Sequence, residues 1–144
     1  MDKIWTTPVS CAILNERSSN TLTSHLGMEF TEVGPNFLVV TMPVDARTLQ
    51  PDGILHGGAT AALVETVASV AANYCLEPGY GPAVGLEINV NHMKAMHPGK
   101  VIATATPCHL GRSTQVWDVK VKDESGRLIA VGRMTMFVIR KTEA

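Results

Sequence analysis

The sequence predicts an α+β fold in which an antiparallel sheet of five to six strands wraps around one long central helix. Three observations lead to this prediction: one long apolar helical pattern, alternating hydrophobic segments on both sides of it, and short turns between the last four strands. Short turns join antiparallel strands, whereas parallel strands need long crossovers. At 144 residues and 45% hydrophobic content, the chain fits one domain over residues 1–144.

The first third of the chain is expected to form short helices, a β-hairpin and a loop. Proline suits the first turn of a helix because it lacks an N–H that would stay unpaired there, and Gly-Pro is a turn signal between strands. The expected segments are a helix beginning near Pro8, a helix over 21–26, strands over 28–33 and 36–44 around Gly34-Pro35, and a loop over 45–54.

A long helix is expected in the middle of the chain. From Ala59 onward, apolar or small residues recur at i, i+3, i+4, i+7, i+8 and i+11, which is the spacing of one helix face. This spacing predicts a helix from about Gly57 to Cys75. The run of proline and glycine over 78–82 then ends it.

The last third of the chain alternates as strands do. Val84, Leu86, Ile88 and Val90 are expected to point to one face of a strand, and the polar residues between them to the other. Three further strands are expected over 101–106, 117–121 and 128–139, the last two joined by a turn at 123–126.

Overall charge excludes several classes of partner. Lys and Arg number 12 against 13 Asp and Glu, so a net charge of -1 provides no field for nucleic acid or an anionic membrane surface. The N-terminus lacks the pattern of a secretory signal, and no apolar run reaches the roughly 18 residues of a membrane span. We therefore expect a cytoplasmic protein that binds neither nucleic acid nor membranes.

The three cysteines are expected to be reduced structural thiols. Cys11, Cys75 and Cys108 are odd in number, contain no C-x-x-C pair and lack the spacing of a zinc site. We expect no metal and no cofactor.

Glu65 is the most informative residue of the sequence. It is the only formally charged residue between Asp52 and Glu77, on a helix built mainly of small and apolar residues. Loss of hydration there favours the neutral carboxyl, which raises the pKa and makes the ionised form a stronger base. Ser69, one helical turn later, could replace part of the lost hydration. We expect Glu65 to be functional.

The alternative is that Glu65 lies on a solvated stripe of the helix. Such a stripe would carry other charges, but positions 58, 61, 68 and 72 are glycine or alanine. Small residues on this face indicate instead that a second backbone approaches closely, as at a contact between helices or subunits.

The helix is expected to begin with His56-Gly57-Gly58. Backbone N–H groups at a helix start have no intrahelical partner, and glycine lets a substrate carbonyl come close to them. They can therefore hold a developing oxyanion. The alternatives are that Gly-Gly is only a loop device and that the histidine is structural.

The spacing between these groups has a geometric consequence. Glu65 follows Gly57 by eight residues, so their backbones lie about 12 Å apart along one helix. One substrate carbonyl cannot readily touch both. If both act on the same bond, the simplest arrangement is two antiparallel copies of the helix across a two-fold axis, with two equivalent sites that each use both chains.

The segment 50–59, followed by Leu63-Val64-Glu65-Thr66, resembles the hotdog-fold acyl-CoA thioesterases. The resemblance extends over nearly the whole chain, through residues 42–48, 84–89, 109–111 and 115–117. The chain is similar to phenylacetyl-CoA and 4-hydroxybenzoyl-CoA thioesterases, and most similar to the branch that hydrolyses 1,4-dihydroxy-2-naphthoyl-CoA or proofreads aryl-carrier proteins in enterobactin synthesis. The resemblance implies hydrolysis of acyl-CoA, aryl-CoA above all, by a dimer of dimers with active sites at the dimer interface. It also implies that no metal is needed and that an acyl or aryl carrier protein is a candidate partner.

The resemblance implies a role for each matching residue. Glu65 would be nucleophile or general base, the Gly57 N–H would hold the carbonyl oxygen, Gln50 and His56 would orient or polarise the thioester, and Ser69 would assist water. His92, Val84 and Gly85 would contact the substrate, and Arg112 and Ser113 would bind CoA phosphates. A solvated surface role for Arg112 remains the alternative.

Two rival functions stay open at this point. An enoyl-CoA hydratase or dehydratase of the same fold would move protons at carbon and leave the thioester intact. A noncatalytic acyl-CoA-binding module would not need Glu65.

Overall fold

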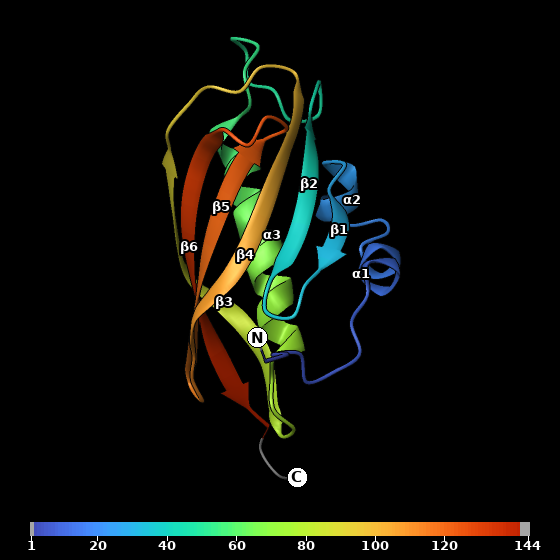
Figure 1. Ribbon diagram of the computed structural model, residues 1–144, viewed down its shortest axis with the longest axis vertical. Helices are drawn as coiled ribbons and strands as arrows, with labels where there is room; N and C mark the ends of the chain where they lie inside the picture. Colours follow the sequence, from blue (N-terminus) through green and yellow to red (C-terminus); the bar gives the residue numbers. More distant parts are fainter. Residues whose placement is uncertain (1, 142–144) are drawn as a thin grey trace.

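Six antiparallel strands form one sheet that wraps around helix α3 in the computed structural model, which describes residues 2–141 (Figure 1). The helices are α1 (Cys11–Arg17), α2 (Leu22–His25) and α3 (Gly57–Tyr74). The strands are β1 (Glu29–Val33), β2 (Leu38–Val44), β3 (Tyr80–His92), β4 (Gly99–Leu110), β5 (Thr114–Asp123) and β6 (Leu128–Arg140). The predicted α+β class is confirmed.

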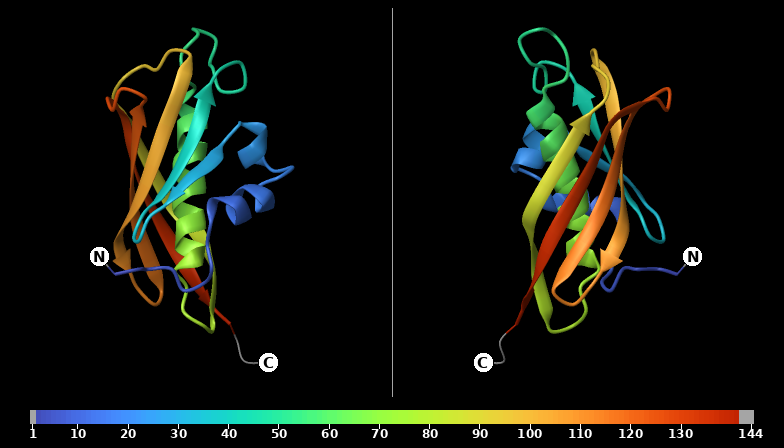
Figure 2. Two further views of the ribbon diagram at one scale, coloured as in Figure 1. Left: turned by 45° about the vertical axis from the view of Figure 1, so that its right-hand side comes forward. Right: turned by 90° about the vertical axis from the view of Figure 1, so that its left-hand side faces the viewer.

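The strands run in the order β1-β2-β4-β5-β6-β3, and all neighbours pair antiparallel. Helix α3 follows β2 and crosses the inner face of the sheet, so that the chain reaches β3 at the far edge (Figures 1 and 2). β3 therefore has one neighbour, β6, and its other side carries no strand among the described residues.

The core lies between α3 and the inner face of the sheet. The helix buries a face built from small and branched residues at helical spacing: Ala59, Thr60, Leu63, Val64, Val67, Ala68, Ala71 and Ala72. The strands contribute alternate, inward-pointing side chains that include Val40, Met42, Ala103, Trp117, Val119 and Met134. Burial of this apolar surface fixes the position of the helix against the sheet.

The expectation for the small-residue face was wrong at two of its four positions. Ala68 and Ala72 are fully buried in the core of the chain itself. The partly exposed side of α3 instead carries Ala61, Ala62, Glu65, Thr66, Ser69 and Val70. Glu65 thus stands at the border between the buried and the uncovered faces of the helix.

The short N-terminal helices are present, although α1 begins after Ser10 and not near Pro8. The Ser10 hydroxyl caps the helix by accepting a hydrogen bond from the Ile13 N–H at 3.3 Å. Both helices lie on the side of the molecule near β1 (Figure 2). Asn15 of α1 holds β1 by accepting from the Phe30 N–H at 2.8 Å and donating to the Phe30 carbonyl at 3.0 Å.

β3 differs from the predicted strand in two ways. It begins at Tyr80, within the segment expected to be a loop. Its pairing with β6 shifts between Gly85 and Glu87, which leaves Leu86 as an extra, bulged residue. A bulge reverses the alternation, so Val84 pairs beside the exposed Phe137 while Gly85 pairs beside the buried Met136. The prediction that Val84 and Ile88 share a face was therefore wrong.

All three cysteines are free thiols, and burial raises the pKa of Cys75 to about 12. None of the helices within residues 2–141 combines the length and the apolar character that crossing a membrane requires.

Candidate active site

The start of α3 is held in place by the loop that precedes it. The His56 N–H donates to the Thr48 carbonyl at 2.8 Å, and the Thr48 hydroxyl donates to the Pro43 carbonyl at 2.7 Å. Thr48 is only 1% exposed. Sequence reasoning missed this residue, although a threonine three residues after Asp45 in a loop is a signal for a hydrogen-bonded turn.

His56 caps the helix and takes up one of its free N–H groups. Its Nδ1 accepts from the Gly58 N–H at 2.8 Å, which in a neutral ring places the proton on Nε2. The Gly57 N–H has no acceptor within residues 2–141. One free donor thus remains at the helix start, where the sequence predicted several.

His92 lies directly beside this donor. A Cβ added to Gly57 would sit 3.2 Å from Nε2 of His92, so the glycine leaves the backbone accessible next to the imidazole. Both residues line a cavity of about 330 Å³ together with Gln50, Thr60 and Met96. The side-chain oxygen of Gln50 accepts from the Asp52 N–H, which leaves its amide N–H groups as donors. The structure therefore brings Gln50, Gly57 and His92 together.

Glu65 lies two turns further along α3. Its carboxylate faces the backbone of β3: a Cβ added to Gly85 would be 3.0 Å from Oε1 of Glu65 and 2.7 Å from the Met134 methyl. Within residues 2–141 its side chain has no hydrogen bond and no ion pair. Burial alone raises the pKa of the carboxyl above its ordinary value, as expected from its apolar helix.

Ser69 does not bond to the Glu65 carboxylate. It lines a groove of about 350 Å³ between α3 and the N-terminal helices, beside Phe30, Val70 and Tyr74. The Arg17 guanidinium donates to the Tyr74 hydroxyl at 2.9 Å at one end of this groove. The groove combines these apolar and aromatic side chains with polar ones such as Thr21 and Asn73, and it begins one helical turn beyond Glu65.

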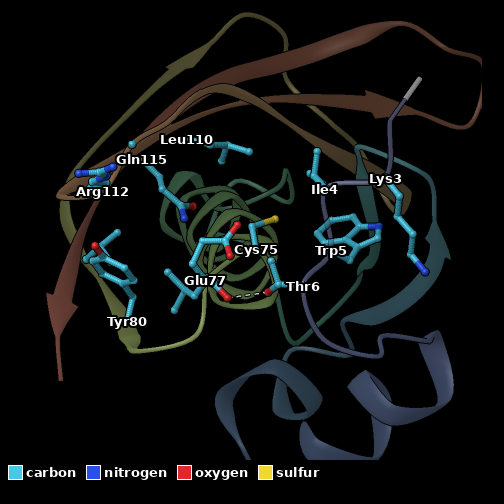
Figure 3. A pocket seen from close by; sticks show the side chains of 13 residues that line it. Lys3, Ile4, Trp5, Thr6, Cys75, Glu77, Tyr80, Leu110, Arg112 and Gln115 are labelled. Carbon is cyan, nitrogen blue, oxygen red and sulfur yellow. Dashed lines mark hydrogen bonds between the residues drawn. The ribbon is translucent and has the colours of Figure 1, made fainter. Parts of the chain in front are cut away.

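Arg112 and Ser113 lie at the opposite end of the sheet from Gly57. Arg112 borders a second cavity of about 350 Å³ around the C-terminal end of α3, with Tyr80, Gln115 and the N-terminal segment that carries Lys3 and Trp5 (Figure 3). The Ser113 carbonyl accepts from the Val138 N–H at 2.9 Å. Within one chain, these residues do not join the cavity at the helix start.

The expected residues thus form separate groups in one chain: donors at the helix start, the carboxylate in the middle, and the guanidinium at the far end. Gly57 and Glu65 belong to one straight helix and lie about 12 Å apart along it. No cluster of three or more His, Cys, Asp or Glu within residues 2–141 is arranged to hold a metal.

Residues 52–130 match the family model described as the thioesterase superfamily. The chain belongs to the thioesterase superfamily. It is 43% identical over 136 residues to the proofreading thioesterase EntH of Cronobacter turicensis, an alignment that covers 94% of this chain and 98% of the relative. It is also 40% identical over 136 residues to the 1,4-dihydroxy-2-naphthoyl-CoA hydrolase of Escherichia coli K12, covering 94% and 99%.

The fold of this thioesterase agrees with solved relatives. The crystal structure of thioesterase HI1161 from Haemophilus influenzae superposes with a TM-score of 0.93 at 45% identity, covering 97% of each chain. The resemblance to hotdog-fold thioesterases is therefore confirmed, and the chain is a thioester hydrolase.

Proposed function

We propose that this thioesterase hydrolyses acyl-CoA thioesters, aryl-CoA above all, with Glu65 as nucleophile or general base and the Gly57 N–H as oxyanion donor. The observation that carries the proposal is the environment of Glu65, a half-buried carboxylate with a raised pKa, no counter-charge within residues 2–141 and a backbone pressed against it. A poorly hydrated carboxylate is a stronger base and nucleophile than a solvated one.

The chemistry follows from these groups. The Gly57 N–H binds the thioester oxygen as negative charge develops on it, with the positive end of α3 behind the donor. Glu65 either removes a proton from water that attacks the carbonyl, or attacks itself to form an anhydride that water then cleaves. In both routes the C–S bond breaks, the thiolate of CoA takes up a proton, and the free acid leaves.

Two chains complete each site in this proposal. An antiparallel copy of α3 across a two-fold axis would bring Gly57 of one chain to Glu65 of the other. Two features support this pairing: α3 has an uncovered side, and the free edge β3 exposes Val84 at 41% and Leu86 at 63%. A long, exposed, apolar edge strand is a surface that proteins normally cover. We propose that two such dimers associate.

The groove beside Ser69 suits the acyl group. It begins one turn from Glu65 and is lined by Phe30, Val70 and Tyr74. The Tyr74 ring in this lining would favour a flat aryl group through offset or edge-to-face packing. Ser69 is then placed to bind the attacking water, as the resemblance implies.

Arg112 and Ser113 suit the other end of the substrate. When Gly57 of one chain faces Glu65 of its copy, the copy's helix extends about 13 Å past that point. The Arg112 end of the copy then lies on the same side as the His56-Gly57-Gly58 turn, where a CoA phosphate could meet it. His92, beside Gly57, would line the entrance. A carrier-protein thioester, which presents the same pantetheine arm, is the second substrate class that we propose.

A panel of benzoyl, dihydroxynaphthoyl, phenylacetyl and medium-chain acyl-CoAs tests the proposal, with thiol release as the readout. The Glu65→Gln variant, which is nearly isosteric, should reduce kcat/KM at least about a hundredfold. Wild-type activity in this variant would reject the role of Glu65. With an enoyl-CoA as a further substrate, loss of enoyl absorbance without thiol release would instead favour the hydratase of the same fold. Solvent oxygen-18 found in the Glu65 carboxylate after a single turnover would support the nucleophilic route.

A further inference from the structure

We propose that Asn73 is a positioning residue that holds the bulged part of β3 against the Glu65 carboxylate. The inference rests on the proposed role of Glu65 and adds a residue that sequence reasoning missed. Asn73 does not touch the reacting atoms, because it lies two turns beyond Glu65 on α3. Its effect on the reaction passes through the backbone of β3.

Asn73 forms hydrogen bonds to the β3 backbone through both the oxygen and the nitrogen of its side-chain amide. Its Oδ1 accepts from the Ala83 N–H at 3.0 Å, and its Nδ2 donates to the Ala83 carbonyl at 3.0 Å. The same Nδ2 donates to the Ser69 carbonyl at 2.9 Å. The side chain therefore ties one residue of the edge strand to one turn of the helix, and that turn also carries Ser69.

The part of β3 around Ala83 depends on these hydrogen bonds because its pairing with β6 is interrupted on both sides. The pairing of β3 with β6 shifts between Tyr80 and Ala83 and again between Gly85 and Glu87. Only a short stretch over 83–85 keeps one register between these two irregularities. On its other side this edge strand has no neighbour within residues 2–141, so within one chain the sheet restrains it weakly.

The same short stretch forms the wall against Glu65. Gly85, two residues after the gripped Ala83, lies where even a methyl group would come within 3.0 Å of Oε1. This close approach excludes water from one side of the carboxylate. Release of Ala83 would let the 83–85 stretch move away from the helix and let water reach Glu65.

Asn73→Asp tests the inference, because a carboxylate cannot donate to the Ala83 carbonyl and would repel it. Water entry should move the pKa of Glu65 down toward its ordinary value, and misplacement of the carboxylate should lower kcat about tenfold or more while KM changes little. The pKa is followed by carbon-13 NMR of labelled glutamate carboxyls, with the Glu65 signal assigned by its absence in Glu65→Gln. Asn73→Ser, smaller and uncharged, serves the same comparison if the aspartate variant does not fold.

Asn15 provides a matched control. It binds the Phe30 backbone of β1, the other edge strand, by accepting from the N–H at 2.8 Å and donating to the carbonyl at 3.0 Å. Asn15→Asp and Asn73→Asp should lower the Tm to a similar extent. Only the Asn73 variant should shift the Glu65 titration and move the acid limb of kcat/KM to lower pH. An unchanged Glu65 pKa and kcat in a folded Asn73 variant, or equal shifts in both variants, would overturn the inference. The NMR titration needs no turnover. An inactive wild-type chain would therefore reject the proposed function, while the titration would still decide whether Asn73 positions β3 against Glu65.

Discussion

The backbone of Gly85 lies against the carboxylate of Glu65: a Cβ added at Gly85 would be 3.0 Å from Oε1. The contact joins a residue of α3 to an edge strand, and it depends on the bulge at Leu86 that turns position 85 inward.

Gly85→Ala should disable the enzyme without unfolding it. The new methyl would meet the Glu65 carboxylate and the Met134 methyl, both of which are ends of flexible side chains that can move aside. We expect kcat to fall about tenfold or more because the carboxylate is displaced. Gly34→Ala, whose methyl would meet the Phe37 ring in the turn between β1 and β2, is the control, and it should retain near wild-type kcat. Equal kcat in the two variants would contradict the prediction.

The raised pKa of Glu65 predicts the pH dependence of both rate and stability. Because the carboxylate is the proposed active form, kcat/KM should rise with pH through a midpoint above the ordinary glutamate pKa of about 4.3. Stability should change in the opposite direction. The folded state prefers the neutral Glu65 carboxyl, so the stabilisation that this group contributes is lost as pH rises through its folded-state pKa. Glu65→Gln should therefore raise the Tm at pH about 7 and leave it unchanged at pH about 3. A lower Tm at neutral pH would argue against a desolvated carboxylate.

Composite sites can be tested by mixing two inactive variants. Gly57→Pro removes the proposed oxyanion donor at the first helical position, where proline is tolerated, and the extended φ and ψ of His56 suit a following proline. Glu65→Gln removes the carboxylate. When the two proteins are unfolded and refolded together, about half of the dimers pair one of each, and each has one intact site. Activity should return to about a quarter of the wild-type value, whereas sites within single chains would give none.

Arg112 should act on CoA and not on the acyl group. Arg112→Gln is expected to raise KM for acyl-CoA about tenfold with little change in kcat, because a charge-assisted phosphate contact is lost. The matching acyl-pantetheine, which lacks the nucleotide, should show the same KM with both proteins. An equal KM increase for both substrates would point to a structural role.

Asp123 should control the acid stability of the β5–β6 turn. Its carboxylate accepts from the Ser125 hydroxyl at 2.7 Å and from Arg127 Nε at 3.0 Å, and these bonds hold its pKa at about 2. The resulting stabilisation is present above the unfolded pKa of about 3.9 and is lost as pH falls toward 2. Asp123→Asn should lower the Tm by several degrees at pH about 7 and remove this pH dependence, as measured by thermal melts between pH 2 and 6. The same acid sensitivity in both proteins would refute the assignment.

Much of this fold follows from local patterns. The helix over 57–74 was predicted within one residue because its apolar spacing and its proline-rich stop are both local, and the isolated charge at Glu65 singled out a desolvated carboxylate. The bulge at Leu86 could not be predicted from the sequence, since it depends on pairing with β6 some fifty residues later. Gly85 within a strand was the available signal.

At the start of α3, too, one feature follows from the local sequence and another does not. A free N–H at Gly57 was predicted from helix geometry, but the capture of the Gly58 N–H by Nδ1 of His56 depends on a rotamer that sequence does not specify. Arg112 illustrates a longer range: its distance from Gly57 is set by which ends of β4 and β5 meet, and no local pattern encodes that pairing.

The bulge at Leu86 also restricts how this chain can change in length. Loss of Leu86 itself would remove the extra residue and leave Gly85 opposite Met136 and Val84 opposite Phe137, so both halves of β3 would keep their inward and outward side chains. Loss of a paired residue elsewhere in β3 would instead shift part of the strand by one position against β6 and exchange its two faces. Deletion scanning across β3 should therefore find the best-tolerated single deletion at this position, and deletions within the paired stretch 88–92 should be the most damaging.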